Sequence, residues 1–161
     1  MAGRNFDDNG SVYRSREFEP IIQRLGGQSS EDGTGRVFST LRDALTFCAF
    51  LGFREGTRKP LDPSAGIEDI QATVFQNDAN GVDAVFALAV AEVEDTNVLK
   101  AEREPEMRSI YEEYANKGLE IVSLWLRENP DLSAQEALIQ GLRSIGIAPS
   151  AESEGFKAPE F

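Results

Sequence analysis

The sequence contains no histidine, so it lacks the side chain that most often serves as a general base, as the partner of a catalytic nucleophile and as a zinc ligand. It has a single cysteine, Cys48, which excludes an internal disulfide. It has no apolar run of about 18 residues, and its polar start lacks the basic-then-apolar order of a signal peptide. We therefore expect a soluble cytoplasmic protein that does not enter a membrane.

Basic residues are scarce relative to acidic ones, with 16 Lys and Arg against 28 Asp and Glu, and the formal net charge is −12. Most of such a surface repels nucleic acid and anionic membranes. Cys48 could be a nucleophile only with a lowered pKa, but its neighbours Phe47, Ala49 and Phe50 are apolar and should raise it. We interpret Cys48 as a small buried hydrophobe, and we predict no catalytic residue, metal ion or cofactor.

The length of 161 residues and a hydrophobic content of 40% suit one compact domain that folds without disulfides or metal. Residues 1–15 lack periodicity and predict a disordered N-terminus. Residues 147–161 contain Pro, Ser and Gly and predict a flexible tail. The predicted domain therefore spans residues 16–146.

Apolar residues recur at helical spacing in five segments of this domain. The segments are residues 17–25, 40–52, 82–93, 105–127 and 133–146. Residues 67–75 alternate only weakly, so a short strand and a short helix both fit there. The pattern predicts an all-α fold, a compact bundle-like or orthogonal domain of about five helices with at most one short extended element.

Several residues indicate where these helices begin and end. Thr40 can cap the second helix, and Gly52 near its end is interpreted as the C-terminal cap, with Phe53 folding back on the last turn. Ser133 and Glu136 have the spacing of a capping box at the start of the last helix.

Carboxylates are dense in one region and could in principle bind Mg²⁺ or act as an acid and base pair. They are Glu92, Glu94, Asp95, Glu102, Glu104 and Glu106. Because they fall in a predicted linker and a first helical turn, we interpret them as a solvated acidic surface.

Positive charge is concentrated in one stretch, where residues 36–59 carry five basic residues against two acidic ones. The basic residues are Arg36, Arg42, Arg54, Arg58 and Lys59. Three interpretations stay open for this basic stretch: plain solvation, docking onto an acidic partner protein, and contact with nucleic-acid phosphate.

Two stretches carry a recognisable order of residues. The first reads Phe-x-Thr-x-x-Asp, then Phe-x-Ala-x-Leu-Gly-Phe, then a basic-Pro pair, with Phe38, Thr40, Asp43, Phe47, Gly52 and Phe53 at its defined positions. The second runs from Glu113 to Ile121 and contains Tyr114, Asn116 and Gly118. Together, over roughly residues 36–128, they resemble the DNA phosphorothioation-associated proteins, specifically the Dnd system-associated protein 4 family.

The chain departs from this family pattern at a few positions. Lys117 stands where the family usually has Gly, and Cys48 and Phe50 stand where alanines are usual, which we expect to enlarge a core helix. The resemblance offers no catalytic residue that could be carried over.

The resemblance implies a place beside bacterial systems that put sulfur into the DNA backbone and restrict unmodified DNA. We expect a non-enzymatic accessory or adaptor protein of such a phage-defence system, bound to components of the modification or restriction machinery. The alternative is a DNA-binding regulator or a DNA-mimicking decoy in the same system. A metal-dependent hydrolase that uses only carboxylates and Lys or Arg is a third hypothesis.

Overall fold

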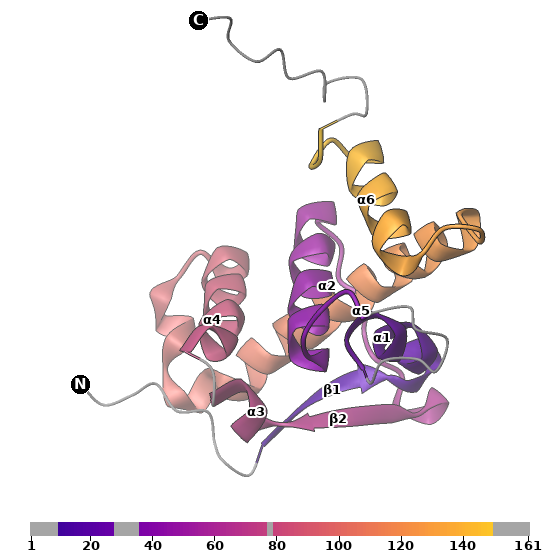
Figure 1. Ribbon diagram of the computed structural model, residues 1–161. Helices are drawn as coiled ribbons and strands as arrows, with labels where there is room; N and C mark the ends of the chain where they lie inside the picture. Colours follow the sequence, from indigo (N-terminus) through magenta and orange to yellow (C-terminus); the bar gives the residue numbers. More distant parts are fainter. Residues whose placement is uncertain (1–9, 28–35, 77–78, 150–161) are drawn as a thin grey trace, which may run out of the picture.

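The computed structural model describes residues 10–27, 36–76 and 79–149 (Figure 1). Within these residues the chain forms six α-helices, several short 3-10 turns and one two-stranded sheet, which confirms the predicted mainly α fold. The predicted disorder of residues 1–9 and 150–161 concerns segments outside the described residues.

Each of the five predicted helices is present, and a short sixth one follows the second strand. Their bounds are α1 Glu19–Gly26, α2 Leu41–Glu55, α3 Ala72–Gln76, α4 Ala79–Val93, α5 Glu104–Glu128 and α6 Ala134–Ser144. The capping box is confirmed, because the Ser133 hydroxyl accepts from the backbone N–H of Glu136 and the Glu136 carboxylate accepts from that of Ser133.

The sheet consists of β1, Ser11–Ser15, and β2, Ile67–Gln71, which pair antiparallel with Val12 opposite Ile70. Residues 11–15 were expected to belong to a disordered terminus, and the structure corrects this. The first strand is held by contacts distant in sequence: Val12 is fully buried, the Tyr13 N–H donates to the Glu112 carboxylate at 2.8 Å, and the Arg14 guanidinium donates to the carbonyl oxygen of Asp69 at 3.2 Å. The ambiguous segment 67–75 divides into β2 and the start of α3.

The second helix does not end at Gly52 as predicted. It continues to Glu55, and Gly56 is the C-cap, with a left-handed φ of 73° that suits glycine. The Gly56 N–H donates to the carbonyl oxygens of Gly52 and Phe53 at 3.1 and 2.9 Å. Gly52 lies inside the helix because another helix passes close to it, as described below.

The core forms where α2 lies across the middle of α5, the most extensive contact between two elements (Figure 1). Two further helices that contact α5 lie on either side of α2: α4 toward the N-terminal half of α5, and α6 toward its C-terminal half (Figure 1). No helix in the described part of the chain is both long and apolar enough to span a bilayer.

Candidate functional site: the signature residues and basic residues around α2 and α5

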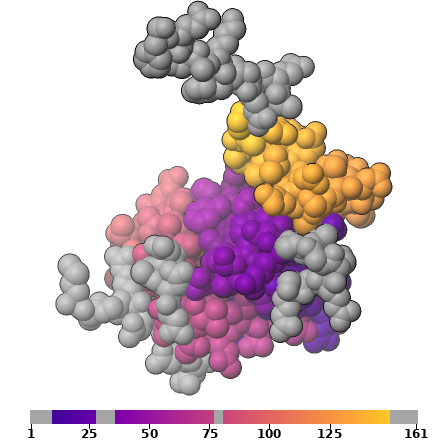
Figure 2. Space-filling model, in the orientation of Figure 1, coloured from indigo at the N-terminus to yellow at the C-terminus, as the bar shows by residue number. Residues whose placement is uncertain are grey.

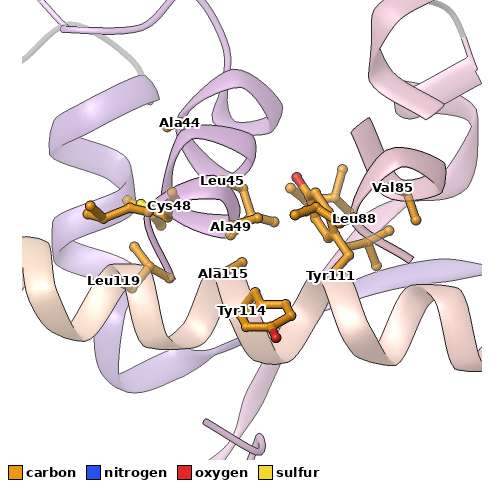
Figure 3. Close-up of a cluster of buried hydrophobic side chains, with 14 of the residues drawn as sticks. Ala44, Leu45, Cys48, Ala49, Val85, Leu88, Tyr111, Tyr114, Ala115 and Leu119 are labelled. Carbon is orange, nitrogen blue, oxygen red and sulfur yellow. The ribbon is translucent and has the colours of Figure 1, made fainter. Parts of the chain in front are cut away.

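Two glycines of the family signature allow α2 and α5 to approach each other closely. A methyl group added to Gly118 would overlap the carbonyl oxygen of Cys48, and one added to Gly52 would overlap the carbonyl oxygen of Tyr114. Small and apolar side chains line this crossing (Figure 3): Leu45, Cys48, Ala49, Ala115 and Leu119. Both glycines are thus explained by backbone contact between the two helices.

The signature aromatics support the same crossing from outside. The Phe38 ring packs on the Phe47 ring with their centroids 5.2 Å apart, which fixes the residues before α2 against that helix. The Phe53 ring meets the Tyr114 ring edge-to-face at 5.3 Å, joining the last turn of α2 to α5.

Asn116, also a signature residue, holds the loop after α2 against α5. Its side-chain Nδ2 donates to the carbonyl oxygens of Lys59 and Pro60 at 3.1 and 3.2 Å, and the Lys59 N–H donates to the carbonyl oxygen of Glu113 at 3.1 Å. Asn116 is only 2% exposed, and its Oδ1 has no hydrogen-bond partner among the described residues. This buried amide therefore fastens the loop through backbone atoms.

Arg58, in the middle of the predicted basic stretch, is paired within the protein. Its guanidinium contacts Glu113 at 2.8 Å and Glu92 at 3.4 Å, and it lies 6.0 Å from the centre of the Tyr114 ring. The Tyr114 hydroxyl donates to Glu92 at 2.5 Å. Partial burial, and secondly the neighbouring Glu92 carboxylate, raise the pKa of Tyr114 to about 12, so this phenol stays protonated at neutral pH.

Lys59 is paired in a similar way, with one carboxylate of α5 and one from the segment before α1. Its Nζ lies 3.0 Å from a carboxylate oxygen of Glu120 and 3.5 Å from one of Glu17. It also lies 4.9 Å from the centre of the Phe18 ring, within the range of a cation–π contact. The positive charges of Arg58 and Lys59 are thus balanced by carboxylates of the same chain.

Arg42 belongs to the N-terminal end of α2, where two signature residues form the cap. The Thr40 hydroxyl accepts from the N–H of Asp43 at 3.1 Å, as predicted for a helix cap. Arg42 lies 3.0 Å from the Asp43 carboxylate and donates to the carbonyl oxygen of Val74 at 3.0 Å. It therefore connects α2 to α3.

The two remaining basic residues, Arg36 and Arg54, are exposed. Arg54 is in the last turn of α2 and donates to the carbonyl oxygen of Ile145 at 2.6 Å. At 1.5 Å per residue, Arg42 and Arg54 are about 18 Å apart along the axis of α2. The structure thus places two of the five basic residues at opposite ends of α2 and the other three in the segments before and after that helix.

Phe50 was expected to enlarge the core, and the structure corrects this: its side chain is 45% exposed. It follows Cys48 by two residues, which is about 200° around a helix, so it points away from the side of α2 that meets α5. Periodicity alone did not separate the two sides, because α2 is apolar almost all round.

Cys48 is fully buried, and burial raises the pKa of its thiol. The predicted interpretation of Cys48 as a buried small residue is confirmed. Within the described ranges, no group of three or more Cys, Asp or Glu side chains is arranged to hold a metal ion.

One titratable residue of interest was missed at the level of sequence. Glu112 lies on α5 beneath β1, and its carboxylate accepts the N–H of Tyr13 at 2.8 Å. Burial raises the pKa of Glu112 to about 7, although the Tyr13 N–H and the nearby Arg108 guanidinium act in the opposite direction. The contact of Glu112 with β1 joins residues far apart in the sequence, so no local sequence signal could have revealed it.

These features define a small, mainly helical domain whose signature residues serve helix packing and loop attachment. The chain belongs to the family described as DNA sulphur modification system-associated protein 4, whose family model matches residues 11–154. The match confirms the resemblance and extends it to β1, α1 and α6. No curated protein and no solved structure gave a match to the chain.

Proposed function

We propose that this protein is a non-enzymatic accessory protein of a DNA sulphur modification system, and that it acts by docking onto a modification or restriction component of that system. The family match supports the connection to the system. We place the interaction in the cytoplasm, where the DNA and its modification machinery meet, and assign it to phage defence.

The proposal rests mainly on one observation, the pairing of basic residues with carboxylates of the same chain. Arg42, Arg58 and Lys59 each contact a carboxylate of the same chain within 3.0 Å. A DNA phosphate would have to compete with these carboxylates, in a chain whose net charge is −12. Docking onto a protein does not require these ion pairs to be broken, because neutral and apolar surface suffices for it.

The proposal is tested by mixing the purified full-length chain with each purified component of the sulphur modification system from the same cell. Size-exclusion chromatography and calorimetry should show a stable one-to-one complex with at least one component. If the wild-type chain binds none of them, the proposal is rejected.

The DNA-binding alternative is tested separately by titrating the chain with duplex DNA at two salt concentrations. We expect no salt-dependent binding at micromolar protein. Binding that weakens steeply with salt and is lost in Arg36→Ala with Arg54→Ala would favour the alternative, because both residues are exposed and their loss should spare the fold.

A further inference from the structure

The outer side of α2, opposite α5, carries aromatic side chains that the core covers only in part. Phe47 and Phe50 are three residues apart and therefore lie on the same side of the helix. Phe47 is half-buried beneath Phe38, whereas Phe50 is 45% exposed. In the view of Figure 2, α2 and the residues before it occupy the centre of the visible face, below α6.

Exposed arginines precede and follow these aromatic residues in the sequence. Arg36 is exposed and lies two residues before Phe38. Arg54 follows Phe50 by four residues, so it lies one turn further along the same side of α2. One of the five N–H donors of its guanidinium bonds to the carbonyl oxygen of Ile145.

The part of α2 that forms this surface carries no acidic side chain before Glu55. Residues 44–54 contain no Asp or Glu, although the protein has 28 acidic residues. At the start of α2, the carboxylate of Asp43 is paired with Arg42 at 3.0 Å. From residue 44 to residue 54 the helix thus carries Arg54 and no acidic side chain, and the exposed Glu55 follows it.

We propose that this surface, formed by Arg36, Phe38, Phe47, Phe50 and Arg54 and called here the α2 face, binds an amphipathic segment of the partner protein that presents apolar side chains flanked by carboxylates. The inference rests on the proposed function and specifies where and with what chemistry the partner docks. The apolar side chains would cover Phe50 and the adjoining edge of Phe47, and the carboxylates would pair with Arg54 and Arg36.

A second copy of the chain fits this surface poorly. In a two-fold symmetric contact the same patch faces itself, so Arg36 and Arg54 would meet arginines of the other copy. An amphipathic partner segment with carboxylates beside its apolar side chains avoids this repulsion, because its carboxylates pair with the arginines.

The test measures affinity between the full-length chain and the sulphur modification component that binds it in solution. The principal variant is Phe50→Ser, and the matched control is Leu124→Ser on α5. The two side chains are 45% and 43% exposed, so both substitutions remove a similar apolar area, but Leu124 lies outside the α2 face. Thermal unfolding and circular dichroism establish that both variants are folded.

We expect Phe50→Ser to weaken binding at least tenfold, while Leu124→Ser stays within about twofold of the wild type. We expect Arg36→Gln and Arg54→Gln each to weaken binding several-fold at low salt and to reduce its salt dependence.

The outcomes separate the two proposals. If the wild-type chain binds a component and Phe50→Ser binds it equally well, the α2 face is not the docking surface, although the proposed function stands. A symmetric dimer that Phe50→Ser dissociates would show that a second copy covers the face and would also overturn the inference. If no component binds the wild-type chain, both proposals fail.

Discussion

Replacing Gly118 with alanine should destabilise the protein, although the same change in an open helix would stabilise it. Alanine is favoured over glycine in a helix interior by about 1 kcal/mol. At Gly118, however, the added methyl group would overlap the carbonyl oxygen of Cys48. Because this obstacle is backbone, no side-chain rotation can relieve it, and α2 must move away from α5.

The expected magnitude follows from the cost of overpacking a tight interface, about 1–3 kcal/mol. Because the obstacle is backbone, we take the upper end of this range, about 3 kcal/mol, and subtract the gain of about 1 kcal/mol from helix propensity. We therefore expect a net loss of about 2 kcal/mol in the free energy of unfolding. For a chain of this size, that corresponds to a fall in Tm of about 4–8 °C. Gly52→Ala should behave alike, since its methyl group would overlap the carbonyl oxygen of Tyr114.

Urea denaturation followed by circular dichroism measures these losses, with Gln140→Ala on the exposed side of α6 as the control. The control should change the free energy of unfolding by no more than about 0.5 kcal/mol. The double variant of Gly52 and Gly118 should lose less than the sum of the single variants, because the first displacement already makes room for the second methyl group. A Gly118→Ala protein as stable as the wild type would refute the close crossing.

Three further predictions concern single side chains. Glu94 has a left-handed φ of 55° at the end of α4, so Glu94→Gly should raise the free energy of unfolding by about 1 kcal/mol; an unchanged or lower urea midpoint would contradict this. Tyr114→Phe removes the hydroxyl that donates to Glu92 but keeps the ring, so it should cost about 1–2 kcal/mol in the same assay, and an equally stable variant would argue against that hydrogen bond. The pKa of Glu112 is raised from 4.5 to about 7 in the fold, so the folded chain holds a proton that the unfolded chain has lost between these pH values. The contribution of Glu112 to stability should therefore fall as pH rises through this window, by up to about 1.4 kcal/mol per pH unit. Glu112→Gln should accordingly gain stability relative to the wild type between pH 5 and pH 8, and a constant difference between the two proteins would exclude the raised pKa.

The long helices were predictable because their signals are local. Apolar residues at helical spacing identified α5, and the spacing of Ser133 and Glu136 identified the start of α6. β1 was not predictable in this way. Its position depends on burial of Val12 and on the bond from Tyr13 to Glu112, which join residues far apart in the sequence.

The candidate site was predictable in composition but not in arrangement. The basic residues of the sequence stretch 36–59 are close neighbours along the chain, yet the length of α2 separates Arg42 from Arg54, and carboxylates of α4 and α5 pair with Arg58. In the same way, the sequence around Gly52 resembles a helix end, because it does not show the close contact of Gly52 with α5. Both features are determined by contacts with helices that lie elsewhere in the sequence, so local sequence could not predict them.

The role of the signature residues as the centre of the fold is tested most directly by native-state hydrogen exchange at the amides of α2 and α5. If the crossing at Gly52 and Gly118 holds the domain together, amides near it should exchange only through global unfolding, with an opening free energy equal to that from urea denaturation. Amides of α6, whose main contact is with α5 alone, should open at a lower free energy. Amides at the crossing that open as easily as those of α6, or more easily, would contradict this role.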